Sequence, residues 1–216
     1  MKDHNSSSLN KVKNYIRTFN IIDEDVLDSM CDTDRSLFTP DYYKPFAYSD
    51  IQIPLSHGQK MLLPSVEGTI LQEMKLTKED NLLVCGSGTG YLSVCATKLA
   101  SHVTGIDIHE DFIMKSFENT KTHKPKNLLL KHLDINNNWD IISDYNRIIM
   151  TFSVNSSKMI LDHMSEDSRA FIFTGDEYSP IKSGKIISKT ENNGYTRDHI
   201  IQTNINHIIK GLNDDD

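Results

Sequence analysis

Several features of common protein classes are missing from this 216-residue sequence. It has only three cysteines, and their spacing matches neither a metal site nor a paired disulfide framework. No apolar run is long enough for a membrane span. The first ten residues are polar and lack the apolar core of a secretion signal, which favours a cytoplasmic protein. The net charge is −7, and no basic stretch predicts binding to a nucleic acid.

The overall composition is that of an ordinary globular protein. Hydrophobic residues make up 38% and charged residues 25% of the chain. Its length suits one compact unit with a sizeable core. We expect an N-terminal helical and loop cap at residues 1–63, a ligand-binding domain at residues 64–212 and a disordered tail at residues 213–216.

Three glycines at intervals of two form the most informative motif. An apolar run of strand character, Leu82 to Cys85, leads into Gly86, Gly88 and Gly90, and a helical pattern begins directly afterwards. Chain that turns from a strand into a helix through glycines brings backbone amides close to a ligand. The amides at the start of the helix then attract a polar or anionic group.

A carboxylate at the end of the next strand adds to this motif. Residues 102–106 (HVTGI) predict that strand, and Asp107 ends it. An acidic residue about 20 positions past the first glycine can accept hydrogen bonds from ribose hydroxyls. The two features together predict a ligand that contains a nucleoside.

The spacing of the glycines restricts which nucleoside fits. The phosphate loop of NTPases ends in Gly-Lys-Ser/Thr, which the chain lacks. The dinucleotide fingerprint needs a glycine three positions after the second one, where Tyr91 stands. The pattern Gly-x-Gly-x-Gly after a strand is similar to motif I of the class I methyltransferases that use S-adenosylmethionine (SAM). For the glycines alone, a tight turn without a ligand is the alternative.

Strand and helix patterns alternate along the rest of the chain. Further strands are predicted at residues 127–131, 147–150 and 170–173, and helices at residues 9–19, 24–31, 64–74, 109–121 and 156–164. Residues 185–189 and 195–202 flank Asn193-Gly194, a strong hairpin signal, whereas residues 35–59 resemble an extended or looped segment. This alternation predicts a doubly wound, mostly parallel α/β sheet with helices on both faces and a C-terminal antiparallel hairpin.

Four polar or glycine positions follow predicted strands. The carboxyl ends of parallel strands meet at one edge of a sheet, where ligands bind in such folds. We therefore expect Gly86, Asp107, Asp134 and Thr151 to lie together at that edge.

The N-terminal third of the chain narrows the class of methyltransferase. Residues 34–40 (DRSLFTP) are similar to a "PR-x-x-F-x-P" element, and residues 47–55 (AYSDIQIPL) to an "AY-x-D…PLP" run. With these segments, residues 12–201 resemble the protein-L-isoaspartate O-methyltransferase family. The resemblance implies a Rossmann-like methyltransferase sheet with N-terminal helices closing over SAM. It also implies methylation of isoaspartyl carboxylates in a protein or peptide, the first step of protein repair.

The same resemblance implies a set of cofactor-binding residues. The glycine loop would surround the amino acid part of SAM, Asp107 would hold the ribose, and three further residues would lie at the adenine. The implied residues are Gly86, Ser87, Gly88, Gly90, Asp107, Ile108, Leu133 and Asp134.

The substrate side differs from the family pattern. The family's Gly-Gln-Thr-Ile-Ser-x-Pro aligns with residues 58–64 (GQKMLLP), so Leu62 replaces the serine that meets the substrate carboxylate. Gln59, Lys60 and Leu62 are the implied substrate-side residues. Lys60 is a candidate for binding the carboxylate, or else a solvated lysine. His57 is a candidate base, or else a loop histidine bonded to the backbone.

Three hypotheses about function follow. A carboxylate nucleophile is ionised at neutral pH, so the leading isoaspartyl reaction needs positioning and exclusion of water, with no general base and no metal. The second hypothesis keeps SAM and changes the acceptor, and the third is a SAM-binding module without transfer activity. Leu62, and Val84 in place of an acidic residue of motif I, keep both alternatives open. The sequence determines neither the acceptor nor the oligomeric state.

Overall fold

A mixed β-sheet forms the centre of the computed structural model, which describes residues 12–190 and 194–209. Within these residues the strand order is β5-β4-β3-β6-β7-β8-β9. The parallel strands are β3 (Asn81–Cys85), β4 (His102–Asp107), β5 (Leu128–His132), β6 (Arg147–Val154) and β7 (Arg169–Thr174). The antiparallel strands are β8 (Lys182–Lys189) and β9 (Tyr195–Thr203). This confirms the predicted fold class, although the predicted turn at residues 191–193 lies outside the described residues.

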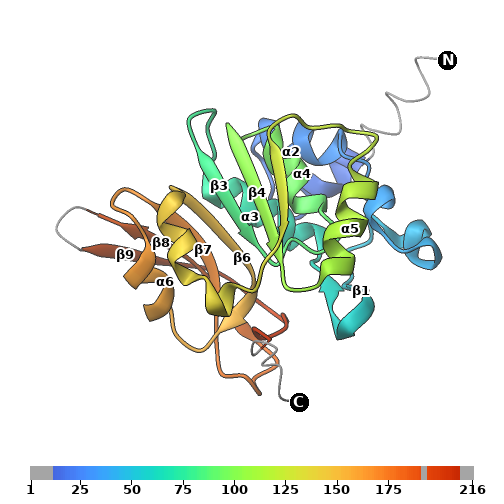
Figure 1. Cartoon of the computed structure of the whole chain (residues 1–216). Helices are drawn as coiled ribbons and strands as arrows, with labels where there is room; N and C mark the ends of the chain where they lie inside the picture. Colours follow the sequence, from blue (N-terminus) through green and yellow to red (C-terminus); the bar gives the residue numbers. More distant parts are fainter. Residues whose placement is uncertain (1–11, 191–193, 210–216) are drawn as a thin grey trace.

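Helices cover both faces of this sheet. One face carries α2 (Glu24–Cys31), α3 (Pro64–Met74) and α4 (Tyr91–Thr97), whose apolar side chains share one core cluster. The other face carries η5 (Trp139–Asp144) and α6 (Lys158–His163) over a second cluster. Figure 1 shows α6 in front of the sheet and α3 and α4 behind it.

The central strand β3 shows why both faces are covered. Leu82 and Val84 belong to the cluster under α3 and α4, whereas Leu83 and Cys85 belong to the cluster under α6. Successive side chains of a strand point to opposite faces, so a strand that is apolar throughout must be buried on both sides. The continuous apolar run before the glycines therefore specifies a central strand.

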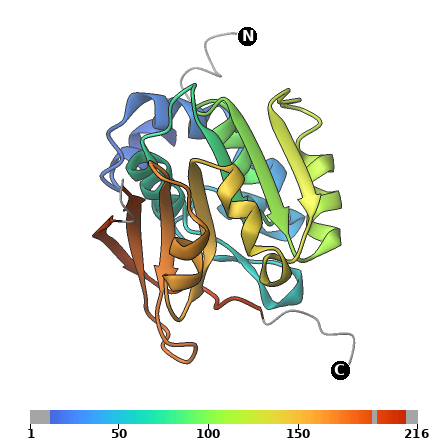
Figure 2. The ribbon, with the colours of Figure 1, turned by 60° about the vertical axis from the view of Figure 1, so that its left-hand side comes forward.

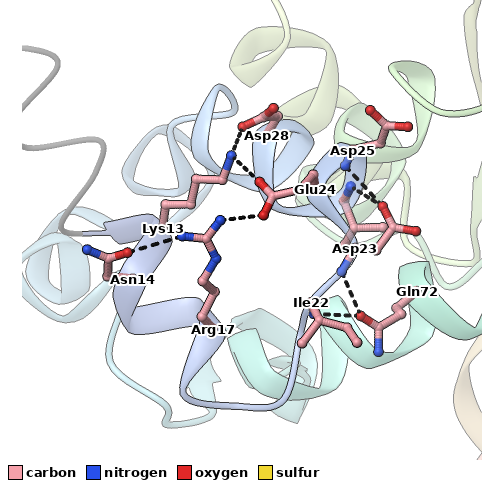
Figure 3. A network of polar contacts seen from close by, with 10 residues as sticks. Lys13, Asn14, Arg17, Ile22, Asp23, Glu24, Asp25, Asp28 and Gln72 are labelled. Carbon is pink, nitrogen blue, oxygen red and sulfur yellow. Dashed lines mark hydrogen bonds and ion pairs between the residues drawn. The ribbon is translucent and has the colours of Figure 1, made fainter.

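The N-terminal cap is attached to α3 by polar contacts. Residues 12–17 are helical, and their Lys13 and Arg17 both pair with Glu24 at the start of α2. The Gln72 side chain of α3 accepts hydrogen bonds from the amides of Ile22 at 2.8 Å and Asp23 at 3.1 Å (Figure 3). These contacts fix the connection between the two N-terminal helices. The apolar residues of this cap join the same core cluster as the sheet, so the division at residue 63 stays a prediction.

The segment predicted to be extended or looped contains short regular elements. These are the 3-10 helices η1 (Arg35–Phe38), η2 (Asp41–Phe46) and η3 (Ser56–Gly58), and the two-stranded sheet of β1 (Ile53–Pro54) and β2 (Lys60–Met61). Asp34 begins η1 by accepting a hydrogen bond from the Ser36 amide at 3.0 Å. Local side chain to backbone bonds of this kind stabilise turns that apolar periodicity does not predict.

The helices of the described residues are short. None of the helices within residues 12–190 and 194–209 has the length and apolar character needed to cross a membrane.

Candidate functional site

A cavity lies where the carboxyl ends of the central parallel strands meet. The empty space inside it is about 670 Å³, which includes space open to solvent at its mouth. It lies at the switch point between β3 and β6, where the strand order reverses. The structure brings together there eight of the residues implied by the sequence: Gln59, Lys60, Gly86, Gly88, Asp107, Ile108, Leu133 and Asp134.

Two glycines of the motif make this edge accessible in different ways. Gly86 has φ 79°, and a Cβ there would lie 2.4 Å from Oγ1 of Thr151, which donates a hydrogen bond to the Gly86 carbonyl at 2.5 Å. Gly88 has φ 53°, and a Cβ there would meet only Cδ1 of Leu55, at 4.0 Å. The space beside Gly88 is therefore open, and a ligand can approach the backbone closely at this position.

Gly90 and Ser87 lie outside this cavity. A Cβ on Gly90 would lie 2.0 Å from Oγ of Ser116 in α5 (Glu110–Asn119), so glycine allows close packing of the loop on that helix. A second, smaller cavity adjoins the first one at the glycine loop. Ser87 lines this second cavity, whereas Gly90 lines neither of the two. The contacts of both residues with a cofactor stay predictions.

Asp107 is buried at the end of β4 with an exposed fraction of 6%. Its carboxylate accepts hydrogen bonds from the amides of Gly88 at 2.8 Å and His109 at 3.0 Å. Burial raises the pKa of Asp107, and these two backbone hydrogen bonds oppose that rise. An ionised carboxylate has about four acceptor positions, so it can also accept hydrogen bonds from ribose hydroxyls.

Apolar side chains and a capped loop also line the cavity. Ile108, Leu133 and Phe152 line it. Asp134 also lines it, but its carboxylate accepts from the Asn136 amide at 2.9 Å and so begins the turn that follows β5. Apolar walls in the same cavity as a buried carboxylate can receive a nucleoside.

A pair of stacked imidazole rings connects the turn at η3 with the start of α5. The rings of His57 and His109 are 4.0 Å apart and inclined by 6°. Nε2 of His57 lies 3.0 Å from Oδ1 of Asp111, in place of the backbone bond expected for a loop histidine. Ligand atoms of these three residues lie within 4.8 Å of one another. However, the lone pairs of parallel rings do not converge on one point, so this conformation is not that of a metal site.

The second, smaller cavity adjoins the first at the glycine loop. Both cavities are lined by Lys60 and Gly88, and the second also by Leu62 and Tyr91. The Lys60 side chain is exposed, and its Nζ lies 3.3 Å from Oε1 of Gln52. The structure therefore places a cation and the apolar Leu62 side by side in the lining where the family pattern has hydroxyl groups.

A buried ion pair holds the segment that carries these residues. Nε of Arg35 lies 2.9 Å from Oε2 of Glu67 in α3, and both side chains are almost completely buried. The same guanidinium donates to the Leu62 carbonyl at 2.7 Å and to the Ala47 carbonyl. Burial raises the pKa of Glu67 to about 7, and the Arg35 charge opposes that rise. The position of Leu62 thus depends on a charge pair inside the core.

Several cavity residues were not identified from the sequence. Phe152 follows Thr151 at the end of β6, so the argument about strand ends could have found it. His109 and Phe112 come from the start of α5, directly after Asp107. Residues 207–209 also line the cavity, and no motif in the sequence indicates them.

Comparison with known proteins identifies the family. The model of the family "Protein-L-isoaspartate(D-aspartate) O-methyltransferase" matches residues 6–200. A protein-L-isoaspartate O-methyltransferase of Aliivibrio salmonicida is 27% identical over 175 residues, covering 81% of this chain and 83% of the relative. One from Roseobacter denitrificans is 23% identical over 210 residues, covering 93% of each.

Solved structures show the same fold. A Plasmodium falciparum protein described as a protein-L-isoaspartate O-methyltransferase, in complex with S-adenosyl-L-homocysteine (SAH), has a TM-score of 0.78 at 21% identity. The match covers 92% of this chain and 97% of that one. Because the family model matches most of the sequence, from residue 6 to residue 200, the chain belongs to the protein-L-isoaspartate(D-aspartate) O-methyltransferase family.

Proposed function

We propose that this chain transfers a methyl group from SAM to the carboxylate of an isoaspartyl residue in a protein or peptide. The observation that carries the proposal is the open space at Gly88 beside the buried Asp107, in a chain that belongs to this family. When bound, SAM supplies a methyl group on a positively charged sulfur that leaves readily. Three buried free cysteines are in keeping with the reducing cytoplasm that we propose as its location.

The residues at the cavity fit the chemistry of SAM. Asp107 offers acceptors for ribose hydroxyls, and Ile108 and Leu133 offer apolar surface for adenine. Gly86 and Gly88 both line the cavity, and the open space beside Gly88 can receive the amino acid part. We assign these five residues, with Asp134 at the adenine edge, to the cofactor.

The chain contributes position and charge to the reaction. The substrate carboxylate is ionised at neutral pH, so it attacks without a general base. Lys60 lies at the junction of the two cavities, where its ammonium group can bind and orient that carboxylate. Leu62 and Tyr91 form an apolar wall there and exclude water from the reacting groups. Lys60 would thus take the role that the family gives to a hydroxyl at position 62.

The direct test uses an isoaspartyl peptide and the matching aspartyl peptide as control. We expect labelled methyl from SAM to appear on the isoaspartyl peptide alone. Family membership favours this result over a different acceptor or a SAM-binding module without transfer activity. If SAH binds in calorimetry but only the Leu62→Ser variant methylates the peptide, the natural acceptor is a different one. If SAH does not bind at millimolar concentration, every methyltransferase hypothesis fails.

The role of Lys60 has its own test. Lys60→Met keeps the length of the side chain and removes the charge. We expect the KM for the isoaspartyl peptide to rise about 10-fold or more, because hydrogen bonds to charged groups contribute about 1.5–3 kcal/mol. The SAH affinity should stay unchanged, and Lys60→Arg should restore part of the loss. Lys131→Met removes an exposed lysine that lines neither cavity, and it serves as control. An unchanged KM would show that Lys60 is only a solvated residue.

A further inference from the structure

A short hairpin brings Gln59 and Lys60 to the edge of the cavity. Its strands β1 and β2 pair antiparallel, and the Leu55 amide donates to the Gln59 carbonyl at 2.8 Å across the turn between them. Figure 1 labels β1 next to α5, and Figure 2 shows the same segment in teal near one end of that helix. The base of the hairpin is therefore fixed by its own backbone, whereas the position of its tip depends on contacts with other parts of the chain.

The tip of the hairpin contains an unfavourable backbone conformation. His57 has φ 56° and ψ 25°, in the left-handed region, and Gly58 follows with φ 65°. A residue with a Cβ atom is disfavoured in this region, whereas glycine adopts it freely. For the backbone alone, glycine would suit position 57 better than histidine. An outlier of this kind persists where surrounding contacts hold it, and it points to a function of the side chain.

Side chains at the start of α5 hold this residue. The His57 ring stacks on His109 at 4.0 Å, and its Nε2 lies 3.0 and 3.1 Å from the two carboxylate oxygens of Asp111. The Phe112 ring stands edge-on to both imidazoles, with centroids 5.6 and 5.3 Å away. Oγ of Ser56 also donates to Asp111, at 3.2 Å. Stacking and hydrogen bonding thus fix the tip of the hairpin to one helix.

Both sides that this contact joins line the cavity. The hairpin contributes Gln59 and Lys60, and the start of α5 contributes His109 and Phe112. His57 itself lines neither cavity, and 43% of its side chain is exposed to solvent. It can therefore affect a bound ligand only through its neighbours. The contact between His57 and α5 sets how the two sides of the cavity lie relative to each other.

We propose that His57 is a positioning residue for the methyl transfer: its contacts with His109 and Asp111 fix the hairpin so that Lys60 meets the substrate carboxylate. These contacts explain why a histidine stands at a left-handed position that favours glycine. The role differs from both hypotheses drawn from the sequence, a base and a loop histidine bonded to the backbone. The inference rests on the proposed function, because it takes Lys60 to bind the substrate.

The substitution His57→Gly separates positioning from stability. Glycine removes the ring but suits the left-handed backbone, so the Tm should stay near that of the wild type. We expect the KM for the isoaspartyl peptide to rise about 3- to 10-fold, since a displaced Lys60 keeps only part of its bond to the carboxylate. The kcat and the SAH affinity should change less than about 2-fold, because His57 lines neither cavity. His57→Gln keeps an N–H donor for Asp111 and should recover part of the KM.

The first turn of α5 offers a matched pair of variants. Asp111→Ala removes the partner of His57, whereas Glu110→Ala removes the neighbouring carboxylate of the same turn. We expect the KM to rise for Asp111→Ala as it does for His57→Gly, and Glu110→Ala to behave like the wild type. The double variant of His57→Gly and Asp111→Ala should be no worse than either single variant, because residues that act through one contact are not additive.

Peptide kinetics with labelled SAM decide the outcome. If His57→Gly and Asp111→Ala keep the wild-type KM, the inference is overturned and the proposed function stays in place. A lower Tm for His57→Gly with an unchanged KM also overturns the inference, since the residue then only stabilises the hairpin. If the wild type does not methylate the isoaspartyl peptide, the inference and the proposed function both fail.

Discussion

The substitution Gly88→Ala is the most direct test of the cofactor site. Gly88→Ala would place a Cβ in the space shared by both cavities, where its nearest neighbour is Leu55 at 4.0 Å. The protein itself therefore accommodates the new atom, and only a ligand competes for its space. Gly58→Ala is a matched control, because Gly58 has φ 65° against 53° for Gly88, and a Cβ there has no neighbour within 4 Å.

The expected magnitudes separate stability from binding. Both positions are left-handed, so each alanine should lower the free energy of unfolding by about 1–2 kcal/mol. Overfilling a tightly packed site costs about 1–3 kcal/mol, which corresponds to about 5- to 150-fold weaker SAH binding for Gly88→Ala. Gly58→Ala should bind SAH like the wild type, because Gly58 lines neither cavity.

Two measurements decide the outcome. Urea unfolding should give similar losses of stability for the two variants, and calorimetry should show weaker SAH binding for Gly88→Ala alone. If both variants bind SAH with wild-type affinity, the ligand does not approach Gly88 and the assignment of the glycine loop is wrong. If both lose affinity equally, the effect comes from backbone strain and not from occupied space.

Three further predictions concern buried or paired ionisable groups. Asp107→Asn should weaken SAH binding about 10- to 150-fold in calorimetry, because a bond to a charged acceptor contributes about 1.5–3 kcal/mol, and unchanged affinity would refute the ribose assignment. Arg35→Met should lower the free energy of unfolding by about 3–5 kcal/mol in urea, since Glu67 stays buried without its partner, while the double variant with Glu67→Leu should recover much of this loss. Burial lowers the pKa of His109 below 6.5, and the neighbouring His57 ring lowers it further. The unfolded chain therefore takes up a proton at this histidine at a higher pH than the folded chain does. The free energy of unfolding should fall as the pH drops below about 6.5. In His109→Gln the loss of stability between about pH 7.5 and about pH 5.5 should be smaller, and an equal loss would contradict this explanation.

The central sheet and the edge with the cavity could be predicted because short-range patterns specify them. The apolar run Leu82 to Cys85 requires burial on both faces, and the glycines after it require a tight turn, so the placement of β3 follows from local sequence. Helix α3 was predicted with the bounds that it has, because Pro64 fits the first turn and an apolar face repeats behind it.

The remaining parts depend on contacts between distant segments. The stack of His57 on His109 joins residues more than fifty positions apart, and neither has a local pattern that indicates the other. The buried pair of Arg35 and Glu67 is equally non-local, and the segment of residues 204–209 has no motif. Gly90 fits the glycine motif by its spacing, yet the structure shows it packed against Ser116.

The segment of residues 204–209, part of which lines the cavity, determines when the cavity is complete. The bond between Gln52 and Asn204 spans 152 positions, and closing so long a loop is slow compared with forming local contacts. A chain emerging from the ribosome can therefore pair β3 with β4 long before residues 204–209 exist. A ligand stabilises only the form that binds it. SAM would therefore stabilise complete chains and would stabilise chains that lack residues 204–209 much less. A truncated product would then lack both the last wall of its site and the protection that the cofactor provides.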